Sequence, residues 1–186
     1  MTWRALVPVK ESESAKSRLA GSLSWAQRRR LSQTMLDHVL RTLREVADIE
    51  LIGIVSRDAP SDGAVSWLRD EGFGLNAELT RARGVWGAHD ILVIHADLPL
   101  VTADDIRALL AAAEESGRAI APDRHGSGTN AVAVKAGQAF HFRFGPDSFE
   151  RHSIDHRPAS VVRRGLAVDV DNAEDIAQMS EAGIES

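Results

Sequence analysis

Cysteine is absent from this 186-residue chain. Its absence excludes disulfides, thiolate zinc sites and thiol catalysis, and it fits a reducing cytoplasm. Long apolar runs are missing as well, since none approaches the roughly 20 residues that cross a bilayer, and the start of the chain lacks a signal-peptide pattern. Basic residues are outnumbered by acidic ones, 22 to 27, which disfavours a broad nucleic-acid-binding surface. We expect a cytoplasmic protein that uses neither membrane nor nucleic acid, folded as a single domain over residues 1–186.

Several familiar functional motifs are also missing. The chain has neither the G-x-x-x-x-G-K-[ST] nor the G-x-G-x-x-G phosphate-binding loop. The seven histidines form no clear metal signature and no H-E-x-x-H, and there is no G-x-S-x-G nucleophile motif. A nucleotide site in this chain must therefore be built from other groups.

The apolar pattern predicts a doubly wound α/β fold. Capping-box pairs at Ser24 and Gln27 and at Thr102 and Asp105 predict two helix starts. Near-continuous apolar segments are typical of strands buried on both faces of a sheet. Strands are predicted at residues 5–9, 51–55, 91–94, 120–121, 131–134 and 166–170.

Three further segments have weaker sequence patterns, from which their secondary structure is predicted. Val65, Leu68 and Arg69 predict a short helix that ends at Gly72. Residues 140–164 predict a loop-rich insertion that could cover a site. Residues 171–174, Asp-Asn-Ala-Glu, predict the start of a last helix.

Ligands in open α/β sheets lie beyond the carboxyl ends of the strands. Lys10, Lys16 and Arg18 follow the first predicted strand. Three cations in such a loop can hold a triphosphate through charge-assisted bonds. The alternative is a loop that is simply exposed and solvated.

Carboxylates follow two other predicted strands, with Asp97 after the third and Asp169 and Asp171 at the last. Mg²⁺ is commonly held by one or two carboxylates together with substrate phosphates. Each also has a structural interpretation, because Asp171 with Glu174 fits a helix N-cap and Asp97 fits a turn before a proline. His95 is expected to pack or to make a local hydrogen bond.

Two segments rich in small residues, 126–130 and 145–148, can present backbone N–H groups to an anion. An ordinary β-turn explains either segment equally well.

Taken together and in order, these stretches resemble the 2-phospho-L-lactate guanylyltransferase family, which includes the phosphoenolpyruvate and 3-phospho-D-glycerate guanylyltransferases. The resemblance spans nearly the whole chain, and its most specific segments are A-P-D-R-H-G-S-G-T-N and F-G-P-D-S-F-E-R-H. It is carried by V-P-V-K at 7–10, A-K-S-R-L at 15–19, G-L-N at 74–76, A-D-L-P-L at 96–100, and the segments at 121–130, 144–152 and 169–175.

The resemblance implies a Rossmann-like, three-layer nucleotidyltransferase fold of the nucleotide-diphospho-sugar transferase type, with a mostly parallel sheet. It also implies transfer of GMP from GTP to a phosphorylated three-carbon acid, with release of pyrophosphate, in coenzyme F-420 biosynthesis. It implies Mg²⁺ as cofactor, and it leaves the acid and the oligomeric state open. Lys10, Arg18 and Asp97 would take part in catalysis. By the same resemblance the nucleotide would be bound by Lys10, Lys16, Arg18, Gly74, Leu75 and Asn76, the acceptor by Thr129, Asn130, Gly145 and Ser148, and the metal by Asp97 with Asp169 or Asp171.

Rival interpretations are a molybdenum-cofactor guanylyltransferase, a glycosyltransferase of similar fold and a non-catalytic nucleotide-binding module. The first carries a glycine-rich opening loop, which residues 10–18 are not. The second needs a D-x-D after the middle strand, where this chain has one Asp. The third would tolerate loss of the metal carboxylates.

Overall fold

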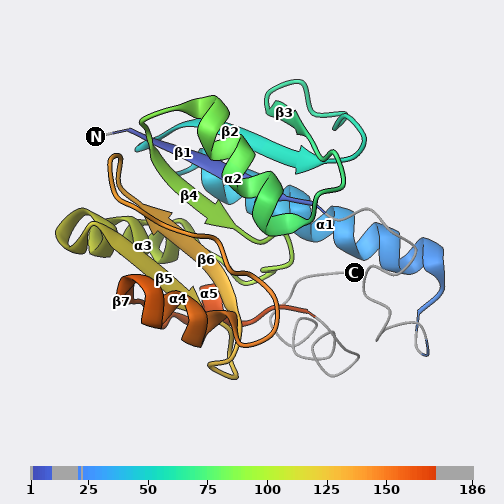
Figure 1. Cartoon of the computed structure of the whole chain (residues 1–186). Coiled ribbons are helices and arrows are strands. Elements are labelled where there is room, and N and C mark those ends of the chain that lie inside the picture. The colour runs from blue at the N-terminus through green and yellow to red at the C-terminus, as the bar shows by residue number, and fades with distance from the viewer. Residues whose placement is uncertain (1, 10–20, 22, 171–186) are drawn as a thin grey trace.

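The computed structural model describes residues 2–9, 21 and 23–170. Seven described strands form one sheet in the order β3-β2-β1-β4-β6-β5-β7, with helices on both faces (Figure 1). Among them only β6 runs antiparallel to its neighbours, β4 and β5. This mostly parallel sheet confirms the predicted α/β class. The strands are β1 Trp3–Pro8, β2 Ile49–Ser56, β3 Ser66–Arg69, β4 Asp90–Ile94, β5 Arg118–Pro122, β6 Thr129–Val134 and β7 Ala159–Ser160; the helices are α1 Trp25–Arg44, α2 Leu75–Trp86, α3 Ala103–Ser116, α4 Ser148–His156 and α5 Arg164–Ala167.

The two faces of the sheet bury alternate residues of the same strands. In β4, Leu92 and Ile94 join the core cluster that contains residues of α1 and α3, whereas Ile91 and Val93 join the cluster that contains residues of α2. Successive side chains of a strand point to opposite faces, so a strand covered on both sides must be apolar throughout. Figure 1 shows α2 on one face and α1 and α3 on the other.

Both predicted capping boxes are confirmed. The Ser24 hydroxyl accepts a hydrogen bond from Gln27 N at 3.3 Å, and Ser24 N donates to Gln27 Oε1 at 2.9 Å. At the start of α3, Asp105 N donates to the Thr102 hydroxyl at 3.2 Å and Thr102 N donates to Asp105 Oδ2 at 3.1 Å. Each box satisfies two N–H groups that a helix start leaves without an intrahelical partner.

The helix predicted near Val65 to Gly72 is wrong, because Ser66–Arg69 is strand β3, parallel to β2. Leu68 is buried in the cluster that contains residues of α2, while its neighbours Trp67 and Arg69 are exposed. This alternation suits the edge of a sheet, and pairing with β2 decides between the two structures for so short a segment.

The strand predicted at residues 166–170 is also wrong, because Arg164–Ala167 is the short helix α5. Gly165 approaches the α3 entry so closely that an added Cβ would lie 2.6 Å from Leu100 O. The carbonyls of Leu166 and Ala167 accept hydrogen bonds from the Asn130 side-chain nitrogen at 3.0 and 3.3 Å. These tertiary contacts replace sheet pairing at this position.

The insertion predicted as loop-rich is more ordered than expected, since it contains helix α4 and strand β7. Its first part, residues 140–147, carries no helix or strand. Phe140, Phe142 and Phe144 are all buried there and belong to the same core cluster as α2. The predicted helix start at residues 171–174 lies outside the described residues.

A charged network closes the opposite edge of the sheet, away from the strands' carboxyl ends. Lys135 Nζ donates to Asp90 Oδ2 at 2.6 Å and to Glu114 Oε2 at 2.7 Å. Ala136 N donates to Asp90 Oδ1 at 2.7 Å. Because Asp90 begins β4 and Lys135 follows β6, the network joins the ends of two central strands.

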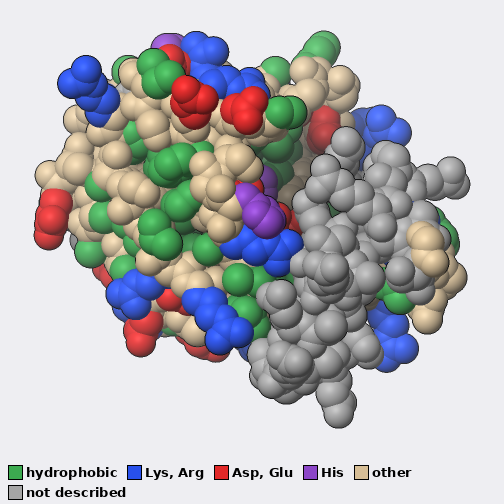
Figure 2. Space-filling model, turned by 90° about the horizontal axis from the view of Figure 1, so that it is seen from below, with side chains coloured by type: hydrophobic (Ala, Val, Ile, Leu, Met, Phe, Trp, Pro, Cys, Tyr) green, Lys and Arg blue, Asp and Glu red, His purple; other side chains and the backbone are tan. Residues whose placement is uncertain are grey.

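No helix in the described ranges is long and apolar enough to cross a membrane. On the face in Figure 2, acidic and basic side chains are interspersed rather than gathered by sign.

Candidate active site

Two cavities open at the carboxyl edge of the sheet, and they share His95 and Asp97 as lining residues. The first has a volume of about 550 Å³ and the second about 280 Å³. Both shared residues directly follow β4, so ligands in the two cavities would meet at the end of this strand. The first is lined by Pro8, Val9, Ser32, Met35, Leu36, Val55, Asp70, Gly72, Gly74, Leu75, Glu78 and Ala96, and the second by Asp123, Gly128, Thr129, Asn130, Phe144, Gly145, Ser148 and Asp169.

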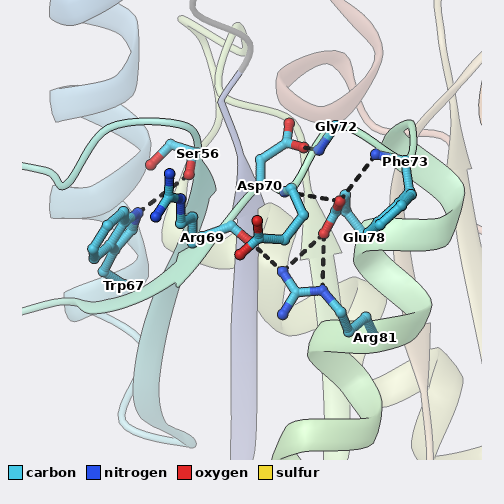
Figure 3. Close-up of polar contacts among 9 residues, drawn as sticks. Ser56, Trp67, Arg69, Asp70, Gly72, Phe73, Glu78 and Arg81 are labelled. Atoms are coloured by element: carbon cyan, nitrogen blue, oxygen red, sulfur yellow. Dashed lines mark hydrogen bonds and ion pairs between the residues drawn. The ribbon is translucent and has the colours of Figure 1, made fainter.

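One wall of the first cavity is the connection between β3 and α2, residues 70–74. Ser56 O, at the end of β2, accepts hydrogen bonds from Asp70 N at 2.8 Å and from the Trp67 indole at 3.2 Å. Asp70 Oδ1 in turn accepts from Gly72 N at 2.8 Å (Figure 3). The start of the connection is therefore fixed to the end of β2.

The buried carboxylate of Glu78 holds the rest of this connection from within α2 (Figure 3). Its Oε1 accepts from Glu71 N at 2.9 Å and from Phe73 N at 3.2 Å, while its Oε2 accepts from Arg81 Nη2 at 2.8 Å. The side chain is 1% exposed. A buried charge is tolerated only when its oxygens are paired in this way.

The pKa of Glu78 reflects this balance. Burial acts to raise the pKa, but hydrogen bonds from Arg81, Phe73 N and Glu71 N outweigh burial and hold it below its usual range. Glu78 is therefore a structural carboxylate whose ionised form organises the wall of the first cavity.

Three of the six residues predicted to bind the nucleotide, Gly74, Leu75 and Asn76, form the N-cap and first turn of α2. Gly74 and Leu75 line the first cavity. The side chain of Asn76 bonds instead to the backbone of Phe144, with Nδ2 donating to Phe144 O at 3.0 Å and Oδ1 accepting from Phe144 N at 2.8 Å. Asn76 thus connects the walls of the two cavities.

The second cavity is built on the turn between β5 and β6, which Asp123 organises. Its Oδ1 accepts from Ser127 N at 2.9 Å and from His125 N at 3.1 Å, and Asp123 N donates to Gly128 O at 3.0 Å. A Cβ at Gly128 would lie 2.7 Å from Asp123 Oδ2, so only glycine fits here without a shift. Because β6 runs antiparallel, this turn lies at the same edge as the end of β4.

All four residues predicted to bind the acceptor line the second cavity, namely Thr129, Asn130, Gly145 and Ser148. Thr129 and Asn130 begin β6, while Ser148 begins α4, and these three are at most 3% exposed. Gly145 has φ +119°, a backbone conformation that favours glycine. Phe149 N donates to Ser127 O at 3.0 Å, which joins α4 to the β5–β6 turn.

Asp97 and Asp169 come together in the second cavity, as predicted for two of the metal-ligand candidates. Val170 N donates to Asp97 O at 3.3 Å, so the backbones of the two segments are hydrogen-bonded. Two carboxylates at a site open to substrate suit Mg²⁺, which usually keeps few protein ligands. The described residues include no group of three His, Cys, Asp or Glu placed to hold a metal. The remaining candidates, Lys10, Lys16, Arg18 and Asp171, lie outside the described residues.

Three residues that line these cavities were not predicted from the sequence to do so. His95 lines both cavities, whereas only packing or a local hydrogen bond was expected. Asp70 and Glu78 line the first cavity. The position of Glu78, a carboxylate four residues after the N-cap Gly74, was a sequence signal that it could bond to the start of α2. The hydrogen bonds of Asp70 depend on β2 and could not be seen from its neighbours in the sequence.

The fold is that of nucleotidyltransferases. The chain superposes on a protein described as a nucleotide-diphospho-sugar transferase from Desulfovibrio desulfuricans, with TM-score 0.73, 15% identity, and coverage of 100% of this chain and 90% of that one. It also superposes on 2-C-methyl-D-erythritol 4-phosphate cytidylyltransferase from Thermus thermophilus, with TM-score 0.62, 16% identity, and coverage of 99% and 100%.

Sequence similarity narrows this class to one family. Residues 3–183 match the family described as "Guanylyl transferase CofC like". Phosphoenolpyruvate guanylyltransferase of Sphaerobacter thermophilus is 40% identical, covering 97% of this chain and 93% of its own, and that of Chloroflexus aggregans is 37% identical, covering 95% and 96%. The chain belongs to this family and is a guanylyltransferase.

Proposed function

We propose that this chain transfers GMP from GTP to phosphoenolpyruvate and releases pyrophosphate, within coenzyme F-420 biosynthesis. The observation that carries the proposal is the pair of cavities that share His95 and Asp97. Two substrates, one in each cavity, would come together at the end of β4. The names of the two relatives at 40% and 37% identity favour phosphoenolpyruvate over 2-phospho-L-lactate and 3-phospho-D-glycerate.

In the reaction, a phosphate oxygen of phosphoenolpyruvate attacks the α-phosphorus of GTP. The bond from that phosphorus to the oxygen of the β-phosphate breaks, and its electron pair leaves with pyrophosphate. The acceptor phosphate is already ionised near neutral pH, so the attack needs no strong general base. The main task of the protein is to bring two polyanions together and to balance their charge.

The larger cavity suits GTP. Its apolar lining, which includes Val9, Leu36 and Val55, fits a base and a ribose. Lys10 follows Val9 directly in the chain, which supports Lys10, Lys16 and Arg18 as the triphosphate-binding cations.

Asp70 is our candidate for recognising the guanine base. Guanine presents two adjacent donors, N1–H and the N2 amino group, and a carboxylate can accept from both. Among the described carboxylates that line the first cavity, Glu78 is already bonded to Arg81 and to the 70–74 connection. Asp97 follows β4, which β2 and β1 separate from β3. Among the described residues, the Asp70 carboxylate accepts one hydrogen bond, from Gly72 N to Oδ1, which leaves its other lone pairs available to a ligand.

The smaller cavity suits the acceptor acid. Thr129, Asn130, Gly145 and Ser148 line it, and the N-terminus of α4 at Ser148 favours an anion. Asp97 with Asp169 or Asp171 would hold Mg²⁺ between the two substrates. When bound there, Mg²⁺ would neutralise phosphate charge and stabilise the charge of the transition state.

A pyrophosphate-release assay tests the function directly. Purified protein with Mg²⁺ and GTP should release pyrophosphate with phosphoenolpyruvate, and much more slowly with 2-phospho-L-lactate or 3-phospho-D-glycerate. The assay is coupled to the downstream transferase so that an unstable product is consumed. Faster release with either of the other acids would overturn the acceptor assignment, and no release with any acid would overturn the guanylyltransferase reaction proposed for this site.

A further inference from the structure

His152 is a buried histidine whose ring is held at both nitrogens. It lies on α4 and is 0% exposed. Its Nε2 lies 2.8 Å from Arg143 N, and its Nδ1 lies 3.0 Å from the Thr129 hydroxyl oxygen. The ring stacks on Phe140 with centroids 5.3 Å apart and meets Phe144 edge-on at 5.1 Å. These contacts leave the ring no room to rotate.

The contact with Arg143 decides which nitrogen carries the proton. A backbone N–H can only donate, so Nε2 must be an acceptor and must carry no hydrogen. A neutral imidazole has its hydrogen on the other nitrogen, and that nitrogen, Nδ1, therefore donates to the Thr129 oxygen. A charged ring would carry a hydrogen on Nε2 as well, so two hydrogen-bond donors would face each other at the contact with Arg143 N.

This assignment fixes the direction of the Thr129 hydroxyl. The oxygen accepts from His152, so its own hydrogen must be donated elsewhere. Within the described residues the Thr129 hydroxyl makes no second hydrogen bond. Thr129 lines the second cavity, where an anionic acceptor is expected.

We propose that His152 is a positioning residue that turns the Thr129 hydroxyl into a hydrogen-bond donor for an anionic oxygen of the acceptor acid. The inference rests on the proposed function of the second cavity. The residue that orients Thr129 thus lies on α4, the same helix that Ser148 begins.

Two substitutions separate the two bonds of His152. The amide of His152→Asn reaches the position of Nδ1 and can still donate to Thr129, whereas that of His152→Gln reaches the position of Nε2 and can accept from Arg143 N. We expect His152→Gln to raise the KM for phosphoenolpyruvate about tenfold, the loss of one hydrogen bond to a charged group. The KM for GTP should stay within about twofold, and His152→Asn should keep the acceptor KM closer to that of the parent.

A double-mutant cycle tests whether His152 acts through Thr129. Thr129→Val removes the hydroxyl at nearly constant shape and should also raise the acceptor KM about tenfold. The double variant His152→Gln with Thr129→Val should be no worse than either single variant by more than about twofold, because both remove the same bond. Additive effects, or equal increases in both KM values, would overturn the proposal.

The proton assignment has a test that needs neither substrate nor a folded His152 variant. In protein labelled with ¹⁵N at histidine, one ring should show the neutral Nδ1–H form, and its shifts should move in Thr129→Val. If that ring is instead protonated at Nε2, the inference fails even when the parent enzyme is active. If the parent releases no pyrophosphate while the ring has the expected form, the proposed function fails instead.

Discussion

The side-chain amide of Asn76 pairs with the backbone of Phe144 through two hydrogen bonds, of 3.0 and 2.8 Å. Asn76 lies in the first turn of α2 beside the first cavity, and Phe144 lines the second. The segments are 68 residues apart in the chain, and this pair fixes their separation at the site. An amide is suited to this role because it offers one donor and one acceptor side by side, which matches the N–H and C=O of one residue.

Substitution of Asn76 should therefore affect the acceptor although the residue lies beside the nucleotide cavity. We expect Asn76→Ala to raise the KM for phosphoenolpyruvate several-fold and to lower the free energy of unfolding by about 1–3 kcal/mol, since two hydrogen bonds are lost. Steady-state kinetics in each substrate and urea denaturation measure the two effects.

Two controls separate this coupling from a general loss of stability. Thr80→Ala removes an exposed bond to Asn76 O one turn further along α2 and should change neither KM. Lys135→Met breaks the network at the opposite edge and should destabilise the protein without changing the KM values. If Lys135→Met raised the acceptor KM as much as Asn76→Ala does, the rise would reflect general destabilisation and would contradict the proposed role of Asn76 in connecting the two cavities.

Asp70→Asn tests recognition of the base. An amide can no longer accept from both N1–H and the N2 amino group of guanine, so the KM for GTP should rise. ITP lacks the N2 amino group, so the preference of the parent for GTP over ITP should shrink by about tenfold in the variant. The measurement is the ratio of kcat/KM for the two nucleotides. An unchanged ratio with a normally folded variant would exclude Asp70 as the guanine acceptor.

The stability contribution of Glu78 should depend on pH in a defined direction. Its pKa in the folded protein lies below the ordinary value of 4.5, because hydrogen bonds from Arg81 and two backbone N–H groups outweigh the opposing effect of burial. A carboxyl group with a lowered pKa stabilises the fold above its unfolded pKa, and the contribution is lost as the pH falls through the folded pKa. At neutral pH we expect Glu78→Gln to cost about 1–3 kcal/mol.

Denaturant unfolding of parent and Glu78→Gln from pH 7 down to pH 3 measures this difference. The two stability curves should converge in acid, below about pH 4.5. Protonation of Glu78 there removes the stabilising negative charge from the parent, and the variant lacks that charge at every pH. A constant gap across this range would mean that Glu78 does not act through its charge. The KM for GTP should also rise in the variant, because the 70–74 connection loses its anchor.

Local signals carried most of the fold prediction, and tertiary contacts decided the rest. Helices α1 and α3 have capping boxes and long apolar stripes, so their starts were predictable from neighbouring residues. Segments β3 and α5 have four residues each, too few for a period to be distinguished. Pairing with β2 makes one a strand, and the close approach of Gly165 to Leu100 makes the other a helix.

The residues of the site also fall into those that local signals predict and those that only tertiary contacts reveal. Asp97, Thr129 and Ser148 follow strands or begin elements at one edge, where the general rule for α/β sheets expects ligands. The family resemblance supplied the roles. The partnership of His152 with Thr129 could not be predicted, because it joins residues 23 positions apart through a helix that was expected to be loop.

The carboxylates Asp97 and Asp169 provide the last test, which concerns the metal. Replacing either by Asn removes one negative charge from the second cavity at nearly constant shape. We expect each variant to lose about a hundredfold or more in kcat, because transition-state charge would be poorly balanced. The Mg²⁺ concentration needed for half-maximal activity should rise in parallel.

A binding measurement keeps this prediction independent of turnover. Calorimetric titration of Mn²⁺ into the protein with GTP should show weaker binding in Asp97→Asn and Asp169→Asn. Asp147→Asn is the matched control, because Asp147 is an exposed carboxylate beside Ser148 that caps no N–H group, and Asn tolerates its φ of 55°. The control should bind Mn²⁺ as the parent does. Parental binding in Asp97→Asn would remove this residue from the metal site, and any loss of its activity would then have to come from contact with a substrate.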